Sequence, residues 1–275
     1  MASNPLQKYF RQPKIFISLP SQGIYNLSGA IDGDVNKLAV YGMTGMDEII
    51  LKTADALLSG ESTARVVRSC CPEIADPWDI SMLDMDLILT AIRIATYGNE
   101  LDSTRLCNNC GAENTYSINL SEIIEFYSQC FYNNNVKVGD LTVTIRPLTY
   151  KQSSEFSVKN FELQQRLAQI NVLQDEVERR DSSKKLLESL SAMRYEIFSA
   201  TIESVAIGAT VVTDRQHIQE WLSNADKDVT DAINKHIEKV KLAWTPPPQT
   251  TVCESCQHQE DVFIELDQSN FFVGA

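Results

Sequence analysis

The amino-acid sequence predicts an α+β fold: a helical core with short strands, a four-cysteine ribbon module built from two distant stretches, and a helical insertion. Segments with apolar residues at helical spacing stand beside short segments in which apolar and polar residues alternate. Two Cys-x-x-Cys pairs occur at residues 107–110 and 253–256. Residues 150–207, which lie between the pairs, have helical periodicity, so the pairs can meet only if the intervening chain folds as an insertion.

Residues 1–100 are expected to form an N-terminal α+β domain. Alternation of apolar residues predicts a strand that begins at residue 14 and turns at residues 20–23, and a second strand at 37–43. A helix should follow, with Thr44 as its N-cap and Gly60 as its stop.

The segment 79–100 is the most strongly apolar helix of the chain. Its apolar residues occur on all sides of the helix, which is typical of a helix buried in a core. Asp84 and Asp86 fall in its first turns, where the helix dipole favours acids, and nothing in their spacing indicates a catalytic pair.

The cysteine content favours a metal site over disulfide bonds. The seven cysteines are an odd number, and the N-terminus lacks the apolar stretch of a secretory signal. Cys70, Cys71 and Cys130 stand among apolar neighbours and are expected to be small buried side chains.

The remaining four cysteines are the predicted ligands of a structural Zn²⁺: Cys107, Cys110, Cys253 and Cys256. Two intervening residues allow both sulfurs of a pair to face one ion, and four thiolates leave no coordination position for water or substrate. Three alternatives remain open: two unrelated pairs of buried thiols, a rubredoxin-like iron centre with the same ligands, and replacement of one sulfur by His258.

The two cysteine pairs lie in segments that resemble each other. When Cys107 is placed on Cys253, the apolar residues that follow also coincide: Ile118 with Ile264, Leu120 with Leu266, and Phe126 with Phe272. Both segments alternate in the manner of a half-buried strand. Residues 101–130 and 249–275 are therefore predicted to form one split zinc-ribbon module.

Residues 131–248 are predicted to be a hairpin followed by the helical insertion. The hairpin should turn at Gly139–Asp140. Apolar residues then recur at helical spacing from Tyr150 to about Ile207, in one long helix or in two helices broken at Asp181–Ser183. The apolar seam would pack within the chain or against another subunit, and two amphipathic helices and the stiff segment 245–250 should follow.

Composition and motifs exclude several classes of function. The formal net charge of −13 disfavours binding to phosphate backbones and to anionic membrane surfaces, and residues 249–272 contain no lysine or arginine. No apolar run is long enough to cross a membrane. No nucleophile elbow, phosphate loop, dinucleotide fingerprint or paired-histidine motif occurs, so we do not expect an enzyme.

Five segments in a fixed order resemble a known family: FISLPSQGIY, MTGMDEIIL, DLILTAIRIATYGNE, CNNCGAENTYSINL and VTIRPLTY. This order resembles the baseplate hub (central spike complex) protein family of T-even-type contractile-tailed bacteriophages. The resemblance implies a structural component or assembly factor of the hub, made in the host cytoplasm and located in the tail baseplate of the virion. It also implies other baseplate hub and tail tube proteins as partners in a symmetric hetero-oligomeric assembly, and it transfers no catalytic residues.

Two other functions compete with a role in the hub. Iron in the four-sulfur site would make the protein a rubredoxin-like electron carrier. A zinc-ribbon regulator that binds nucleic acid has the right cysteines, but the acidic residues around them would repel phosphate.

Overall fold

The computed structural model describes residues 5–52 and 59–262. The fold is a mixture of helices and small antiparallel sheets, as the sequence predicts. The chain divides into two compact units. Unit 1 consists of Met1–Phe131 and Trp244–Ala275, and unit 2 consists of Tyr132–Ala243. Unit 2 is thus one continuous stretch of chain inserted into unit 1.

Helix α4 (Met82–Tyr97) forms the centre of unit 1. It packs against the antiparallel pair β1 (Ile15–Ile17) and β2 (Leu38–Val40), and against α3 (Glu61–Cys70) and α5 (Leu120–Gln129). Its buried residues lie on all its sides: Met85, Leu87, Ile88, Leu89, Ala91, Ile92 and Ala95. The prediction of a core helix at 79–100 is confirmed. Short 3₁₀ turns lie at Gln7–Tyr9 and Pro77–Asp79.

Helix α1 (Gly45–Leu51) begins at the predicted N-cap. The Thr44 hydroxyl accepts the N–H of Asp47, and the Asp47 carboxylate accepts the N–H of Thr44. Helix α1 ends at Leu51, where the N–H of Lys52 closes the last turn. The predicted continuation of the helix over residues 53–58 lies outside the described residues. Gly60, the predicted stop, directly follows a helical residue at 59 and has a φ of +79°, the left-handed conformation typical of a glycine that ends a helix; α3 begins at the next residue.

The first turn of α4 contains a buried carboxylate that is well hydrogen-bonded. Asp84 accepts hydrogen bonds from the N–H and the hydroxyl of Ser21 and from the side-chain amide of Asn26. Burial raises the pKa of Asp84, although these hydrogen bonds partly lower it. Burial also raises the pKa of Asp86, to about 7. Asp84 therefore fastens the loop that contains Ser21 and Asn26 to the central helix.

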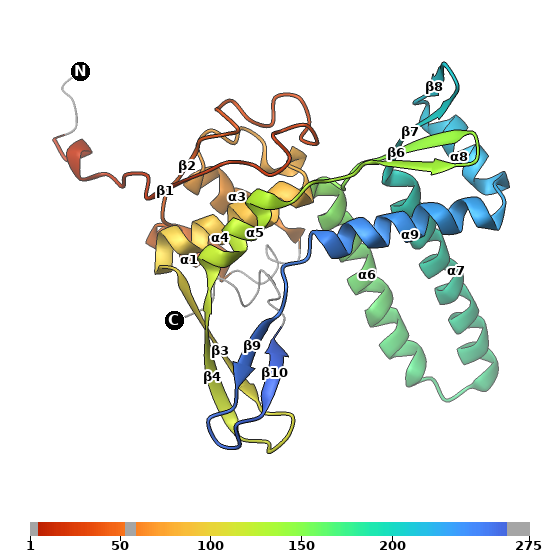
Figure 1. Ribbon diagram of the computed structural model, residues 1–275. Helices are drawn as coiled ribbons and strands as arrows, with labels where there is room; N and C mark the ends of the chain where they lie inside the picture. Colours follow the sequence, from red (N-terminus) through yellow and green to blue (C-terminus); the bar gives the residue numbers. More distant parts are fainter. Residues whose placement is uncertain (1–4, 53–58, 263–275) are drawn as a thin grey trace. The chain divides into compact units, whose positions relative to one another are not determined.

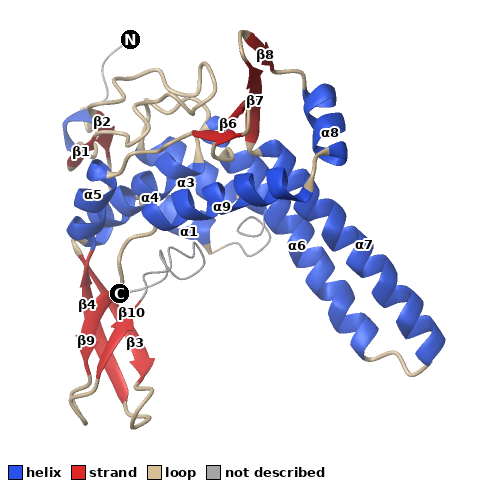
Figure 2. Ribbon diagram, turned by 45° about the vertical axis from the view of Figure 1, so that its right-hand side comes forward, coloured by secondary structure: helices blue, strands red, loops and turns tan. Residues whose placement is uncertain are grey.

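Two β-hairpins complete the description of unit 1. In the first, β3 (Glu100–Leu106) pairs with β4 (Glu113–Asn119), and in the second, β9 (Gln249–Val252) pairs with β10 (Gln259–Val262). The two hairpins lie side by side, with their turns at the same end (Figures 1 and 2). The predicted strand at 116–120 falls largely in β4. The matching strand at 262–266 begins at the end of β10, and its remainder lies outside the described residues.

Unit 2 is built on a four-stranded antiparallel sheet in the order β5–β6–β7–β8. Its strands are Asn135–Val138, Leu141–Ile145, Ile202–Ile207 and Thr210–Val212. The hairpin predicted at Gly139–Asp140 is confirmed by the pairing of β5 with β6. Helices α8 (Arg215–Asn224) and α9 (Lys227–Ala243) pack on this sheet. The shared core consists of Val136, Val143, Ile145, Ile202, Val205, Ile218, Leu222 and Ile233.

A helical hairpin connects β6 to β7. Helices α6 (Tyr150–Asn171) and α7 (Glu176–Ala200) lie beside each other (Figure 1) and bury a small apolar seam of Leu163, Ile170 and Leu186. The chain reverses between these helices and not at Asp181–Ser183, because the Asp175 carboxylate caps α7 by accepting the N–H groups of residues 177 and 178. The helical pattern predicted up to Ile207 is also wrong at its end, since the last six residues form β7.

No helix within residues 5–52 and 59–262 combines the length and the apolar character that crossing a bilayer requires.

Candidate metal centre

The two hairpins bring the four predicted ligand residues together. Cys107 and Cys110 lie in the turn between β3 and β4, and Cys253 and Cys256 lie in the turn between β9 and β10. The four Sγ atoms all lie within 4.8 Å of one another. Across the two hairpins, the Sγ atoms of Cys107 and Cys256 are 3.8 Å apart and those of Cys110 and Cys253 are 3.7 Å apart.

These distances match a tetrahedral metal site. A tetrahedron with metal–sulfur bonds of about 2.3 Å has edges of about 3.8 Å between sulfurs. A disulfide would need about 2.05 Å, so the cysteines are not bonded to one another. The first cysteine of each pair, Cys107 or Cys253, is buried. The second cysteine is more accessible: Cys110 is exposed and Cys256 is partly exposed. The arrangement can therefore enclose one ion near the surface of unit 1.

The same backbone hydrogen bonds build both turns. The N–H of Cys107 donates to the carbonyl of Ala112 and the N–H of Gly111 donates to the carbonyl of Cys107, each at 2.8 Å. In the second hairpin, the N–H of Cys253 donates to the carbonyl of His258 and the N–H of Gln257 donates to the carbonyl of Cys253, each at 2.9 Å. The resemblance between the two segments is therefore real at the level of backbone geometry.

One position of each turn requires left-handed backbone. Gly111 has a φ of +70° and the equivalent Gln257 a φ of +59°. Glycine adopts this conformation without steric cost, whereas a residue with a Cβ is strained by about 1–2 kcal/mol. The second turn keeps the geometry of the first despite this strain.

Each hairpin also caps the turn of the other one. The side-chain oxygen of Asn114 in β4 accepts the N–H of Glu254 at 3.0 Å, and the carboxylate of Glu260 in β10 accepts the N–H of Asn108 at 3.5 Å. Asn114 and Glu260 occupy equivalent positions in the two segments. Because the contacts are reciprocal, the two hairpins are related by an approximate two-fold axis through the sulfur cluster.

Side-chain amides donate to the sulfurs in the pattern found around metal-bound thiolates. The Nδ2 of Asn114 lies 3.4 Å from the Sγ of Cys253, and the Nδ2 of Asn109 lies 3.5 Å from the Sγ of Cys256. Such bonds stabilise negative charge on sulfur.

The thiol pKa values show how charge is distributed in the cluster. Burial raises the pKa of Cys253, but N–H groups of residues 256 and 255 and the neighbouring thiols outweigh burial and lower it to about 6. The amide of Asn109 lowers the pKa of Cys256. A backbone hydrogen bond from Ala112 lowers the pKa of Cys110, but contacts with the other three cysteines, together with burial, raise it to about 12. The thiolate form is thus favoured at Cys253 and Cys256 and disfavoured at Cys110.

The other sequence-predicted residues lie outside this cluster. Cys70 and Cys71 are fully buried, as expected, and Cys130 is partly exposed, so the expectation for Cys130 is wrong. His258 contributes its backbone carbonyl to the turn and does not belong to the sulfur cluster. The equivalences of Ile264, Leu266 and Phe272 lie outside the described residues.

Sequence reasoning missed the residues that support the turns, namely Asn114, Glu260 and Gln257. The same alignment of the two segments pairs Asn114 with Glu260 and Gly111 with Gln257, so the signal was present in the letters. It was inconspicuous because the paired residues differ in chemical type.

Comparison with known proteins places the chain in a family. The family model described as "T4 bacteriophage base plate protein" matches residues 43–273, which is most of the chain and includes all four cysteines of the cluster. No curated protein and no solved structure gives a significant match.

Proposed function

The chain belongs to the T4 bacteriophage base plate protein family, and from this membership we propose that it is a structural component of the hub of a contractile-tail baseplate. The family implies a virion tail component that assembles with other tail and baseplate proteins. The hub is the finer part of the proposal, and it is supported by the order of the five segments that resemble hub proteins.

We propose further that Cys107, Cys110, Cys253 and Cys256 bind one Zn²⁺ and that the ion is structural. The observation that carries this proposal is the cluster of four sulfurs with tetrahedral spacing. Four thiolates fill the coordination sphere, so the ion cannot bind a substrate or activate water. Its chemistry would be limited to joining two hairpins of unit 1 that are far apart in the chain, and the proposal includes no catalytic residue.

A structural ion suits a part of a contractile machine. Metal binding adds directly to folding free energy, by about 10 kcal/mol or more in small zinc peptides. A component at the hub would have to withstand contraction of the tail, and a tightly joined unit resists local unfolding under load. The acidic surroundings of the cluster, which include Glu254, Glu260 and Asp261, favour protein partners over nucleic acid.

The experiment that tests the proposed function is a mass-spectrometric inventory of mature phage particles. A structural component should be present in a fixed copy number that matches a symmetric assembly. An assembly factor, which is the alternative within the same family, should occur in tail precursors and be absent from finished particles.

Metal analysis of the same preparation tests the ion. Stoichiometric zinc in a colourless protein supports the structural site, whereas coloured protein with stoichiometric iron would support the electron carrier and contradict the zinc proposal.

A further inference from the structure

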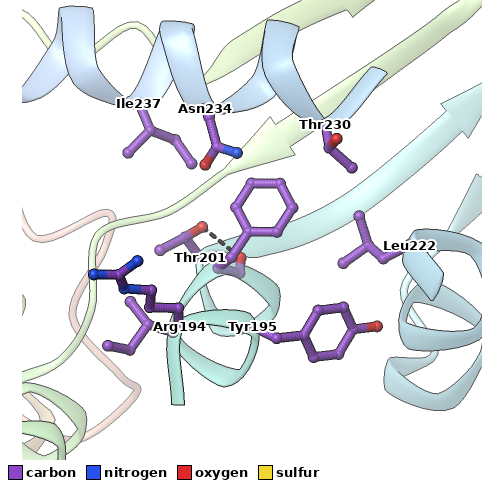
Figure 3. A pocket seen from close by; sticks show the side chains of 9 residues that line it. Arg194, Tyr195, Thr201, Leu222, Thr230, Asn234 and Ile237 are labelled. Carbon is purple, nitrogen blue, oxygen red and sulfur yellow. Dashed lines mark hydrogen bonds between the residues drawn. The ribbon is translucent and has the colours of Figure 1, made fainter. Parts of the chain in front are cut away.

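Unit 2 contains a surface pocket that the proposed metal centre does not use. The pocket has a volume of about 530 Å³ and is lined by residues of α7, α8 and α9 and by the residue that follows α7. Its apolar wall consists of Ile197, Phe198, Leu222 and Ile237. Figure 3 shows Leu222 and Ile237 on different sides of the pocket. A volume of this size is within the range of natural ligand pockets.

Two polar side chains of the pocket have unused hydrogen-bonding groups. Within the described part of the chain, the guanidinium of Arg194 has no ion pair or hydrogen bond, and the side-chain amide of Asn234 has no hydrogen bond. Both residues are exposed at the surface. Figure 3 shows Arg194 at one end of the pocket and Asn234 directed into it from α9.

The other polar groups of the pocket already have partners. The hydroxyl of Tyr195 contacts the carbonyl of Gln219 and the hydroxyl of Ser223, both at 2.8 Å. The hydroxyls of Thr201 and Thr230 donate to backbone carbonyls at 2.7 and 2.9 Å. The unused donors are therefore confined to one cationic group and one amide beside an apolar wall.

We propose that this pocket binds a segment of a partner protein that presents a bulky apolar side chain next to a carboxylate. The apolar side chain would lie against Phe198 and Ile237, and the carboxylate would accept hydrogen bonds from Arg194 and Asn234. Local charge complementarity carries the choice of a carboxylate, because an arginine with no ion pair or hydrogen bond within the described residues borders the apolar wall of the pocket. Apolar pockets bordered by arginine and aromatic residues are also where protein interfaces concentrate binding energy.

The identity of the partner as a neighbouring tail protein rests on the proposed function, but the chemistry of the pocket does not. The test therefore uses the purified full chain and two defined probes, N-acetyl-L-phenylalanine and its uncharged amide, N-acetyl-L-phenylalaninamide. Binding is measured at low ionic strength from NMR shifts of the methyl groups of Ile197, Leu222 and Ile237. The outcome does not depend on whether mature particles contain the chain, so failure of this proposal and failure of the hub proposal are distinguishable.

We expect the acid to bind about two- to five-fold more tightly than the amide, as for an ion pair at the surface. Arg194→Gln should abolish this preference because it weakens binding of the acid more than binding of the amide, and Thr230→Phe should weaken both probes by filling the pocket. Arg180→Gln is the matched control, because Arg180 is also exposed on α7 but does not line the pocket.

Three results would overturn the proposal. Equal affinity for acid and amide would indicate a purely apolar occupant. Retention of the preference in Arg194→Gln, or its loss in Arg180→Gln, would show that the chain binds acids without using this pocket. Absence of methyl shifts with either probe would show that the pocket does not accept an apolar group.

Discussion

Loss of the metal should destabilise unit 1 by an amount that the chain connectivity sets. The ion would tie Cys110 to Cys253, which are 143 residues apart. If the ion is treated as a cross-link, the chain-entropy relation for a loop of this length gives about 5 kcal/mol at 25 °C. A change of 1 kcal/mol shifts the melting temperature of a domain of about 150 residues by about 2–4 °C, so we expect a fall of about 10–20 °C.

Differential scanning calorimetry before and after treatment with a chelator measures this fall, and metal content is determined on the same samples. Cys256→Ser should have the same effect as the chelator, because three remaining thiolates leave the tetrahedron open. Cys130→Ser is the control, since Cys130 is a partly exposed cysteine outside the cluster. All four sulfurs belong to unit 1, so a separate transition of unit 2 should not move.

The reasoning would be refuted by a protein that carries no bound metal and melts at the same temperature with chelator, without it and as Cys256→Ser. A downward shift in the Cys130→Ser control equal to that of Cys256→Ser would show that loss of any thiol is destabilising and would remove the cluster from the explanation.

Three further predictions concern unit 1. Gly111→Ala should lower the free energy of unfolding by about 1 kcal/mol, and Gln257→Gly should raise it by up to about 1 kcal/mol, because both positions have positive φ. Denaturant titration measures both changes. An unchanged free energy of unfolding in Gly111→Ala would contradict the strain argument. Asp84→Ala should lower the free energy of unfolding by about 3 kcal/mol in the same assay, since it leaves the buried donors of Ser21 without an acceptor. Asp79→Ala is the control, and an equal loss of stability in both variants would be evidence against Asp84 as the acceptor that stabilises this loop. The raised pKa of Asp86, about 7, means that the folded state binds more protons than the unfolded state between about pH 4 and pH 7. The unfolding free energy should therefore contain a contribution that falls as pH rises through this window, and Asp86→Asn should remove it; identical pH profiles for the two proteins would contradict the assignment.

The features that sequence reasoning predicted correctly depend on local chemistry. The apolar residues of α4 require burial on all sides, and the glycine of the hairpin at Gly139–Asp140 supplies its turn with a φ of +59°. The approach of the four cysteines followed from residue type and spacing, although nothing local indicates that distant segments meet. Their role as zinc ligands stays a prediction until metal is measured.

The features that were missed depend on partners distant in sequence. Strand β3 has mostly exposed residues, so it shows no alternation of apolar and polar positions and was not predicted. Strand β7 follows α7 directly, and its residues were assigned to the helix because only pairing with β6 distinguishes them. The turn between α6 and α7 is a local exception: its position depends on which acid caps α7, and the cap is Asp175, whereas Asp181 lies within the helix.

The order of the sulfurs along the chain imposes a sequence of events on synthesis. Cys256 leaves the ribosome 149 residues after Cys107, a delay of about 7–30 s at usual elongation rates. Unit 2 is translated wholly within that interval, so it can fold while the first hairpin still has an open pair of thiols. If the cluster binds an ion, coordination by all four sulfurs consequently waits until Cys256 has been synthesised, and a chain truncated before residue 253 can never complete it.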